Sequence, residues 1–421
     1  MNITQLDNGL RVVVEKIPTF RSVSFGIWVK TGSRNESPNN NGISHFIEHM
    51  LFKGTDRYSA KDIADIFDGI GGNVNAFTSK EYTCFYAKVL DEHLPKAIDV
   101  LADMFFRSKF DAEEMEKEKN VILEEIAMYE DTPDDLVHDL VSRAAYGDHP
   151  LGYSILGNQE RLKDMVPEDL RQYMKAHYRL DNTVISIAGN IQDDVMELIE
   201  QYFGIFDNRA DNIPLSPPPF HDGYLFHAKK TEQHHLCLSL PGYSMDHPNI
   251  YAMILLNNMI GGGMSSRLFQ EIREKRGLAY SVYSYHSAHT DSGSFTIYAG
   301  TAPLQMNELI KVTVDVLADI RDRCITVEEL TKGKEQLKGN LILSLESTSS
   351  RMNRIGKNEL LLSRHLSLDA LIDRIDQISM PLIQAAASHL FSKPFAISMV
   401  GSSDQSISGF RRDSLVLSST D

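Results

Sequence analysis

The sequence predicts an α+β protein made of two similar α/β-sandwich halves, and length is the first reason. The chain has 421 residues, whereas single hydrophobic cores stop growing near roughly 250–300 residues. The second reason is a proline-rich segment, ADNIPLSPPPF at residues 210–220, which predicts a stiff linker. The linker, taken as 210–222, separates an N-terminal domain, 1–209, from a C-terminal domain, 223–421.

The third reason is an internal repeat that spans the linker. The strand-like runs RVVVEKI and YLFHAKK each follow an Asn-Gly or Asp-Gly turn, and the runs NTVISIAGN and PFAISMVGS lie near the end of each half. Three pairs of positions have nearly equal separations along the chain, namely Arg11 with Tyr224, Gly189 with Gly401, and Pro167 with Pro381. Nearly constant offsets predict duplication of one unit, although short apolar strands can also resemble one another by chance.

The elements of the first half follow from residue patterns. Strand formers predict strands at 11–16 and 22–30 and a hairpin of 74–78 with 84–90, and helical periodicity predicts helices at 42–53 and 94–107. Asp111 and Glu114 form a capping-box pattern ahead of a long helix that reaches about Glu130. Thr132 as N-cap and Pro133 at the first helical position predict the next helix.

Composition excludes several classes of protein. Hydrophobic residues make up 42% and charged residues 24%, which is typical of a globular chain. The formal charge of −16 disfavours nucleic acid as a partner, because an acidic surface repels phosphates. The three cysteines, Cys84, Cys237 and Cys324, are too few and too widely spaced for a disulfide framework. No signal-peptide pattern or membrane-spanning apolar run is present, so we expect a cytoplasmic location and no membrane partner.

The chemistry is indicated by the run His45-Phe46-Ile47-Glu48-His49. Two His four positions apart lie on one face of a helix, where both imidazoles can bind one Zn²⁺. Glu48 lies on the flank of that face and can reach a water molecule beside the metal without being a ligand. This HxxEH order is the inverted zinc-peptidase motif, although five residues also match by chance and paired His are often structural.

A catalytic zinc needs a third protein ligand. The helix after Asp111 offers Glu118, Glu124 and Glu125, of which Glu118 and Glu125 are two turns apart and share a face. An acidic helix is often only a solvated surface, and spacing alone does not select among these glutamates.

Longer motifs carry a resemblance to a known family. The run HFIEHMLFKGT, followed further along the chain by Glu125 in EKNVILEEI, resembles the insulinase/pitrilysin metallopeptidases. The similarity is strongest to the branch of mitochondrial processing peptidase and its bacterial homologues. It extends over nearly the whole chain, including NAFTS at 75–79, HPLGYSILG at 149–157 and SRLFQEIREKRGLAYSV at 266–282.

The resemblance implies two duplicated halves that form a clamshell around a chamber. It also implies one zinc ion per chain and assigns roles to the metal-binding, catalytic and substrate-binding residues. The implied ligands are His45, His49 and Glu125, with Glu48 as catalytic base and Glu118 as the acid that orients a ligand His. In the second half, Arg273 and Tyr280 would reach the active site and stabilise the oxyanion; without the zinc motif they would be read as structural. The implied substrate-binding residues are Phe52, Asn75, Ala76, Phe77, Asp135 and Asp139.

Two further functional classes compete with a zinc endopeptidase. One is a non-catalytic scaffold or core subunit of the same fold, which typically loses motif residues; this chain keeps them. The other is zinc storage, which a three-ligand site beside a glutamate disfavours. The endopeptidase interpretation implies an extended, unstructured or basic peptide substrate. Because one chain carries both the zinc half and the Arg–Tyr half, we expect a homodimer.

Overall fold

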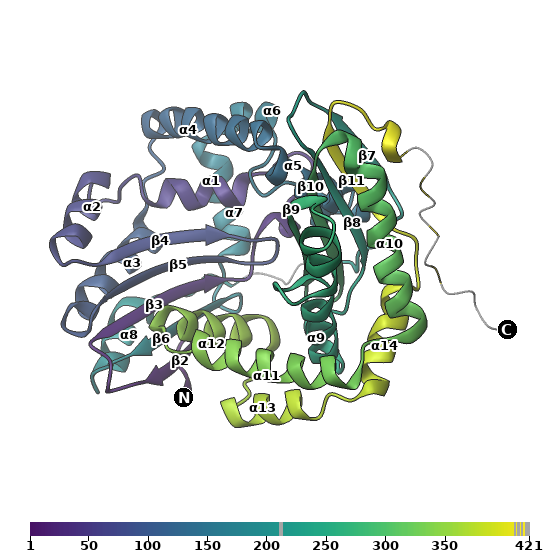
Figure 1. Ribbon diagram of the computed structural model, residues 1–421. Helices are drawn as coiled ribbons and strands as arrows, with labels where there is room; N and C mark the ends of the chain where they lie inside the picture. The colour runs from purple at the N-terminus through teal and green to yellow at the C-terminus, as the bar shows by residue number, and fades with distance from the viewer. Residues whose placement is uncertain (210–213, 408–409, 411–412, 414–415, 417–421) are drawn as a thin grey trace. The chain divides into compact units, whose positions relative to one another are not determined.

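A computed structural model describes residues 1–209, 214–407, 410, 413 and 416, so positions 210–213 at the start of the predicted linker lie outside the described part (Figure 1). The described chain divides into two compact units, each assembled around one sheet. Unit 1 comprises residues 1–126, 154–215 and 343–365, and unit 2 comprises 127–153, 216–342 and 366–421. Within the described residues no helix is both long and apolar enough to cross a membrane.

Unit 1 contains a six-stranded sheet in the order β1-β2-β6-β3-β5-β4. Its strands are β1 (Asn2–Gln5), β2 (Arg11–Lys16), β3 (Ser22–Val29), β4 (Asn73–Thr78), β5 (Thr83–Leu90) and β6 (Thr183–Gly189). Its helices are α1 (Ile43–Leu51), α2 (Ala60–Gly69), α3 (Leu94–Arg107), α4 (Ala112–Asp131, whose last turn belongs to unit 2), α6 (Gln159–Asp164), α7 (Pro167–His177), α8 (Val195–Phe203) and α12 (Thr348–Leu362).

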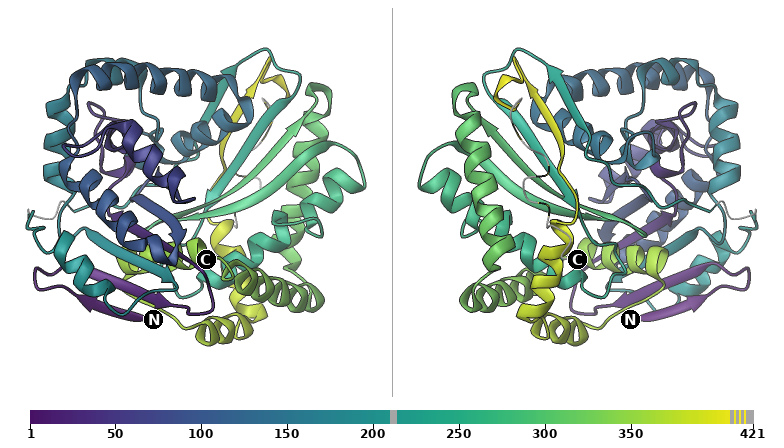
Figure 2. Two further views of the ribbon diagram at one scale, coloured as in Figure 1. Left: turned by 90° about the vertical axis from the view of Figure 1, so that its left-hand side faces the viewer. Right: turned by 90° about the vertical axis from the view of Figure 1, so that its right-hand side faces the viewer.

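Unit 2 contains a five-stranded sheet in the order β7-β11-β8-β10-β9. Its long strands twist visibly in both views of Figure 2. They are β7 (Tyr224–Ala228), β8 (His234–Pro241), β9 (Ala279–Ala288), β10 (Gly293–Thr301) and β11 (Ala396–Gly401). The helices are α5 (Pro133–Tyr146), α9 (Ile250–Gly261), a π-helical turn (Phe269–Glu274), α10 (Met306–Arg323), α11 (Val327–Ser344, which ends in unit 1), α13 (Leu368–Asp376) and α14 (Met380–Leu390).

The two sheets confirm the predicted pair of similar α/β halves. Apart from the additional edge strand β1, they share one strand order, and each has a single parallel pair at the equivalent place. Arg11 of β2 lies opposite Val184 of β6, and Tyr224 of β7 lies opposite Ile397 of β11. The step along the chain from Arg11 to Tyr224 equals the step from Val184 to Ile397, so the sequence repeat and the strand pairing have the same offset.

Each unit also contains one helix from the other half of the sequence. α12 covers the face of the unit 1 sheet formed by β2, β3 and β6 (Figure 1), and α5 packs against β7, β8 and β11 in unit 2. At the first of these contacts, a Cβ on Gly356 would come within 2.3 Å of the Trp28 indole nitrogen, so the close approach requires glycine. The compact units therefore differ from the predicted domains 1–209 and 223–421 by this reciprocal exchange. A fragment ending at the linker lacks the helix that covers one face of its own sheet.

Most predicted helix starts agree with the structure, but one cap differs. The Asp111 carboxylate accepts hydrogen bonds from the Glu113 and Glu114 amides, as a cap of α4 should. Thr132 is the N-cap of α5, as predicted, but its hydroxyl donates to the Met128 carbonyl and makes no capping hydrogen bond to α5. The reason is that α4 extends to Asp131, so its free terminal carbonyls lie within reach of the Thr132 side chain.

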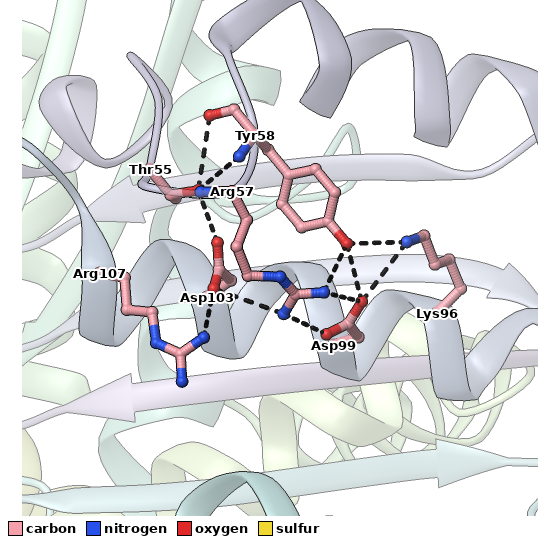
Figure 3. A network of polar contacts seen from close by, with 7 residues as sticks. All are labelled: Thr55, Arg57, Tyr58, Lys96, Asp99, Asp103 and Arg107. Carbon is pink, nitrogen blue, oxygen red and sulfur yellow. Dashed lines mark hydrogen bonds and ion pairs between the residues drawn. The ribbon is translucent and has the colours of Figure 1, made fainter.

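A polar network fixes the loop that follows α1 (Figure 3). Asp103 of α3, whose side chain is 1% exposed, accepts hydrogen bonds from Thr55 (2.5 Å), Arg107 (3.2 Å) and Arg57 (3.5 Å). Arg57 also forms two hydrogen bonds to Asp99, at 2.8 and 3.2 Å. The network ties residues 55–58 to α3, and so anchors the chain just beyond α1.

We expect Asp103→Asn to lower the free energy of unfolding by about 2 kcal/mol, because it weakens the acceptor of a buried network. Asp65→Asn is the control: Asp65 pairs with Lys61 on an exposed face, where such pairs contribute under about 1 kcal/mol. Urea unfolding, followed by the fluorescence of Trp28, the single tryptophan, measures the free energy of unfolding of both variants. Equal losses in the two variants would contradict the role assigned to the network.

Candidate metal centre

The helix α1 presents His45 and His49 on one face. Their Nε2 atoms lie 3.2 Å apart and their ring centroids 4.5 Å apart. Seven of the nine residues of α1 are buried, since its apolar side chains pack into the unit 1 core. The imidazoles are therefore held on a rigid element.

The third side chain comes from α4. Glu125 Oε2 lies 3.8 Å from His45 Nε2 and 3.5 Å from His49 Nε2. A tetrahedral ion with ligand bonds of ~2.0–2.1 Å places its ligand atoms about 3.3 Å from one another. The separations of 3.2, 3.5 and 3.8 Å are short enough for all three side chains to bind one metal ion. In the described part of the chain this is the one group of His, Cys, Asp and Glu side chains that could do so. The neighbouring Glu124 is exposed and takes no part in this group.

Glu118 and Lys53 orient His49. Glu118 Oε1 lies 2.8 Å from His49 Nδ1, and its other oxygen lies 2.6 Å from the Lys53 ammonium. A carboxylate that accepts from Nδ1–H leaves Nε2 free to bind a metal. Sequence reasoning assigned no role to Lys53. Its position four residues after His49, at the end of the predicted helix 42–53, was the signal that could have found it.

The two imidazoles differ in protonation. Burial, together with the charge of His49, lowers the pKa of His45 to about 4, so this ring is neutral and its lone pair is available. Burial also opposes protonation of His49, but hydrogen bonds to Glu118 and Glu125 outweigh it and raise the pKa of His49 to about 9. A metal ion at this site therefore competes with a proton on His49.

Glu48 lies beside this group, and the Thr78 hydroxyl donates a hydrogen bond to its Oε2 at 2.5 Å. Burial raises the pKa of Glu48, more than the Thr78 hydrogen bond lowers it. A carboxyl group with a raised pKa exchanges protons more readily near neutral pH than an ordinary glutamate does.

The residues assigned to substrate binding in unit 1 occupy α1 and β4. Phe52 is the C-cap of α1 and packs against the core. Asn75, Ala76 and Phe77 lie on β4, which pairs only with β5 among the described strands and is therefore an edge strand. Asn75 is exposed, Ala76 is buried, and Phe77 packs edge-on against Trp28.

In unit 2, Arg273 and Tyr280 lie together. The Arg273 guanidinium donates to the Tyr280 carbonyl at 2.9 Å and stacks over the Tyr280 ring, 4.4 Å from its centroid. The Tyr280 side chain is otherwise open, with 76% of its surface exposed.

Asp135 and Asp139 lie one turn apart on α5, also in unit 2. Asp135 is exposed and Asp139 half-buried, and neither forms an ion pair with any described residue. By contrast, the nearby Asp131 is paired with Lys229 at 2.7 Å. The two carboxylates on α5 are thus available to a cationic group.

No comparable metal group occurs in the described part of unit 2. Asn257, near the position equivalent to His45, accepts a hydrogen bond from the Ser284 hydroxyl at 2.8 Å. The adjacent His234 and His235 are buried and bond to Ser402 and Tyr298 respectively, which agrees with a structural role.

Comparison with family models matches most of the chain. Residues 11–159 match the model described as insulinase, peptidase family M16, and residues 164–337 match the model described as peptidase M16 inactive domain. The first match covers the candidate metal ligands His45, His49 and Glu125 as well as the neighbouring Glu48.

Sequence relatives and solved structures agree with these matches. The chain is 54% identical to the uncharacterized zinc protease YmxG of Bacillus subtilis over 94% of this chain and 97% of the relative. It is 42% identical to the uncharacterized zinc protease SCO5738 of Streptomyces coelicolor over 94% and 89% of the two chains. A protease from Helicobacter pylori has a similar fold, with a TM-score of 0.89 and 24% identity over 95% and 99% of the chains. A chain of Complex III2 from Candida albicans also has a similar fold, with a TM-score of 0.83 and 20% identity over 97% of this chain and 96% of that chain.

Proposed function

The chain belongs to the insulinase family of peptidases, family M16, and from this premise we propose that it is a zinc-dependent endopeptidase of extended or unstructured peptides. The observation that carries the proposal is the group of His45, His49 and Glu125, whose ligand atoms lie 3.2 to 3.8 Å from one another, close enough to bind one zinc ion. Three protein ligands leave a fourth position open, as catalytic zinc sites do. A non-catalytic scaffold would need neither this group nor the oriented His49.

Zinc bound there would polarise the scissile carbonyl and lower the pKa of a neighbouring water molecule. Glu48 would accept the proton of the attacking water and return it to the leaving amine. The raised pKa of Glu48 suits both steps, because one carboxyl group must act first as base and then as acid. Glu118 and Lys53 would keep the His49 ring in its ligand orientation.

We propose that the substrate is bound as an added strand on β4. The outer edge of β4 is not paired with any described strand, and main-chain pairing along Asn75, Ala76 and Phe77 would hold a peptide in register. Phe52 would line the pocket for the residue after the cut. Arg273 and Tyr280 would donate hydrogen bonds to the oxyanion formed during attack.

Asp135 and Asp139 lead to a prediction about specificity. Two carboxylates one helical turn apart can bind a guanidinium group, and a desolvated pair of this kind contributes enough for tenfold discrimination or more. We expect kcat/KM to be at least about tenfold higher for a peptide with Arg two residues before the cut than for its Ala counterpart. The variant with both Asp135→Asn and Asp139→Asn should lose this preference and retain zinc.

The measurement is the Arg/Ala ratio of kcat/KM for the wild type and the double variant. Asp134→Asn is the matched control, since Asp134 is an exposed carboxylate of the same helix on a different face. A ratio that stays the same in the double variant would show that Asp135 and Asp139 only complement the helix dipole.

The proposal as a whole is tested by cleavage of an unstructured basic peptide before and after chelation. We expect cleavage by the zinc-loaded chain, its loss on chelation, and its return with one equivalent of zinc. Full cleavage by the chelated chain would contradict it. We further propose a homodimer and a cytoplasmic location, which sedimentation analysis and cell fractionation test.

A further inference from the structure

Thr78 is the last residue of β4, and its side chain faces α1. Successive residues of a strand point to opposite faces of the sheet. Ala76 belongs to the core that includes α1, whereas Phe77 packs against Trp28, which faces α12. Alternation therefore directs Thr78 to the α1 face, where its hydroxyl meets Glu48 Oε2 at 2.5 Å.

A glutamate carboxylate needs such a partner to be held in one orientation. Rotation about its terminal torsion is broad and roughly two-fold, so packing alone fixes it poorly. In the described part of the chain, the Thr78 hydroxyl is the one side-chain donor to Glu48, and it engages Oε2. The hydrogen bond thus distinguishes the two carboxylate oxygens.

The segment 32–36 makes hydrogen bonds next to Thr78 and at the start of the helix that carries Glu48. Ser33 and Arg34 donate backbone hydrogen bonds to the Ser79 and Lys80 carbonyls, just beyond Thr78. The buried Glu36 carboxylate accepts from the Gly42 and Ser44 amides, at 2.8 and 2.9 Å, and so caps the N-terminus of α1.

The segment 32–36 also contributes a buried ion pair. Arg34 bonds to Glu81 in the β4–β5 turn at 2.7 Å, and both side chains are at most 4% exposed. The end of β4 and the start of α1 are therefore fixed by contacts that do not involve the Thr78 hydroxyl. Removing that hydroxyl should leave both elements in place.

We propose that Thr78 is a positioning residue for Glu48: its hydroxyl holds the carboxylate in one rotational orientation and reserves Oε1 for proton exchange with the attacking water. This inference rests on the proposed peptidase function. It also connects substrate binding with catalysis, because the backbone of Thr78 continues the edge strand on which the peptide is proposed to pair.

The test compares Thr78→Val, which removes the hydroxyl at nearly constant shape, with Thr78→Ser, which keeps it. We expect Thr78→Val to lower kcat by about 10- to 100-fold, since small misplacements of reacting groups have effects of this size. KM should change by less than about threefold, zinc content should not change, and Thr78→Ser should retain most of the wild-type kcat. Thr83→Val is the control: Thr83 lies opposite Thr78 on β5, and its hydroxyl donates to the Thr31 carbonyl instead of to Glu48.

A double-mutant cycle separates positioning from general structural support. In a Glu48→Gln background, Thr78→Val should lower the residual kcat by less than about threefold, because the group that it positions is already altered. A wild-type kcat in Thr78→Val, an effect on KM alone, loss of zinc, or an equal loss of kcat in Thr83→Val would each overturn the proposal and leave the peptidase assignment standing. Failure of the zinc-loaded wild type to cleave any peptide would instead refute the proposed function.

Discussion

Glu48→Gln is expected to lower kcat by about 10²- to 10⁴-fold while the zinc content stays at one ion per chain. The substitution keeps the size of the side chain and an oxygen that can accept the Thr78 hydrogen bond, but it removes the base that accepts a proton. Glu48 is not part of the ligand group, so the metal should remain bound. Zinc analysis and single-turnover cleavage on the same preparation check the expected zinc content and the expected loss of kcat.

The outcome that would contradict this role is cleavage by Glu48→Gln at the wild-type rate. Loss of zinc from the variant would also contradict it, because Glu48 would then belong to the ligand set. Retained zinc with lost cleavage is the combination expected of a base beside a metal, and it excludes Glu48 from the ligand set.

The second large effect is expected at α4, where three glutamates allow a graded comparison. Glu125→Gln should lower zinc affinity by more than about 100-fold, because it removes a proposed ligand. Glu118→Gln should lower it by about 10- to 100-fold, the usual range for a residue that orients a ligand His. Glu124→Gln should leave it unchanged, since Glu124 is exposed.

Competition with a chelator of known affinity measures all three variants on one scale. The order Glu125, Glu118, Glu124 is the predicted order of effect. An effect of Glu124→Gln as large as that of Glu125→Gln would contradict the ligand set and would point to a general effect of charge on the helix.

How much of the fold and of the candidate site could be predicted from the sequence depends on how far apart the interacting residues lie along the chain. His45, Glu48 and His49 belong to one short helix, so helical spacing alone places the two His on one face. The similarity of the two sheets also follows from local patterns, such as the strand-like runs at Arg11 and Tyr224, that recur at a nearly constant offset. These features require no knowledge of distant contacts.

The choice between Glu124 and Glu125 could not be made in this way. Adjacent residues of a helix differ in direction by about 100°, and which direction faces α1 depends on how α4 packs. The resemblance to the family selected Glu125, and the distances to the two imidazoles agree with it. The bond of Thr78 to Glu48 is of the same long-range kind, because it joins a strand to a helix that are separate in the sequence.

The exchange of α5 and α12 is the largest feature that the sequence did not indicate. A proline-rich linker marks where the repeat begins again, but not which helix covers which sheet. α5 begins at Pro133 and α12 at Thr348, which are equivalent places in the two copies of the repeat. Each helix has an apolar side, and nothing in its sequence says whether it packs on its own sheet or on the other one.

Anomalous diffraction at the zinc edge, from crystals of the zinc-loaded chain, tests the central claim most directly. The account predicts one strong peak per chain, at ~2.0–2.2 Å from His45 Nε2, His49 Nε2 and a Glu125 carboxylate oxygen. A principal peak at any other set of side chains, or the absence of a peak from crystals of an active preparation, would contradict it.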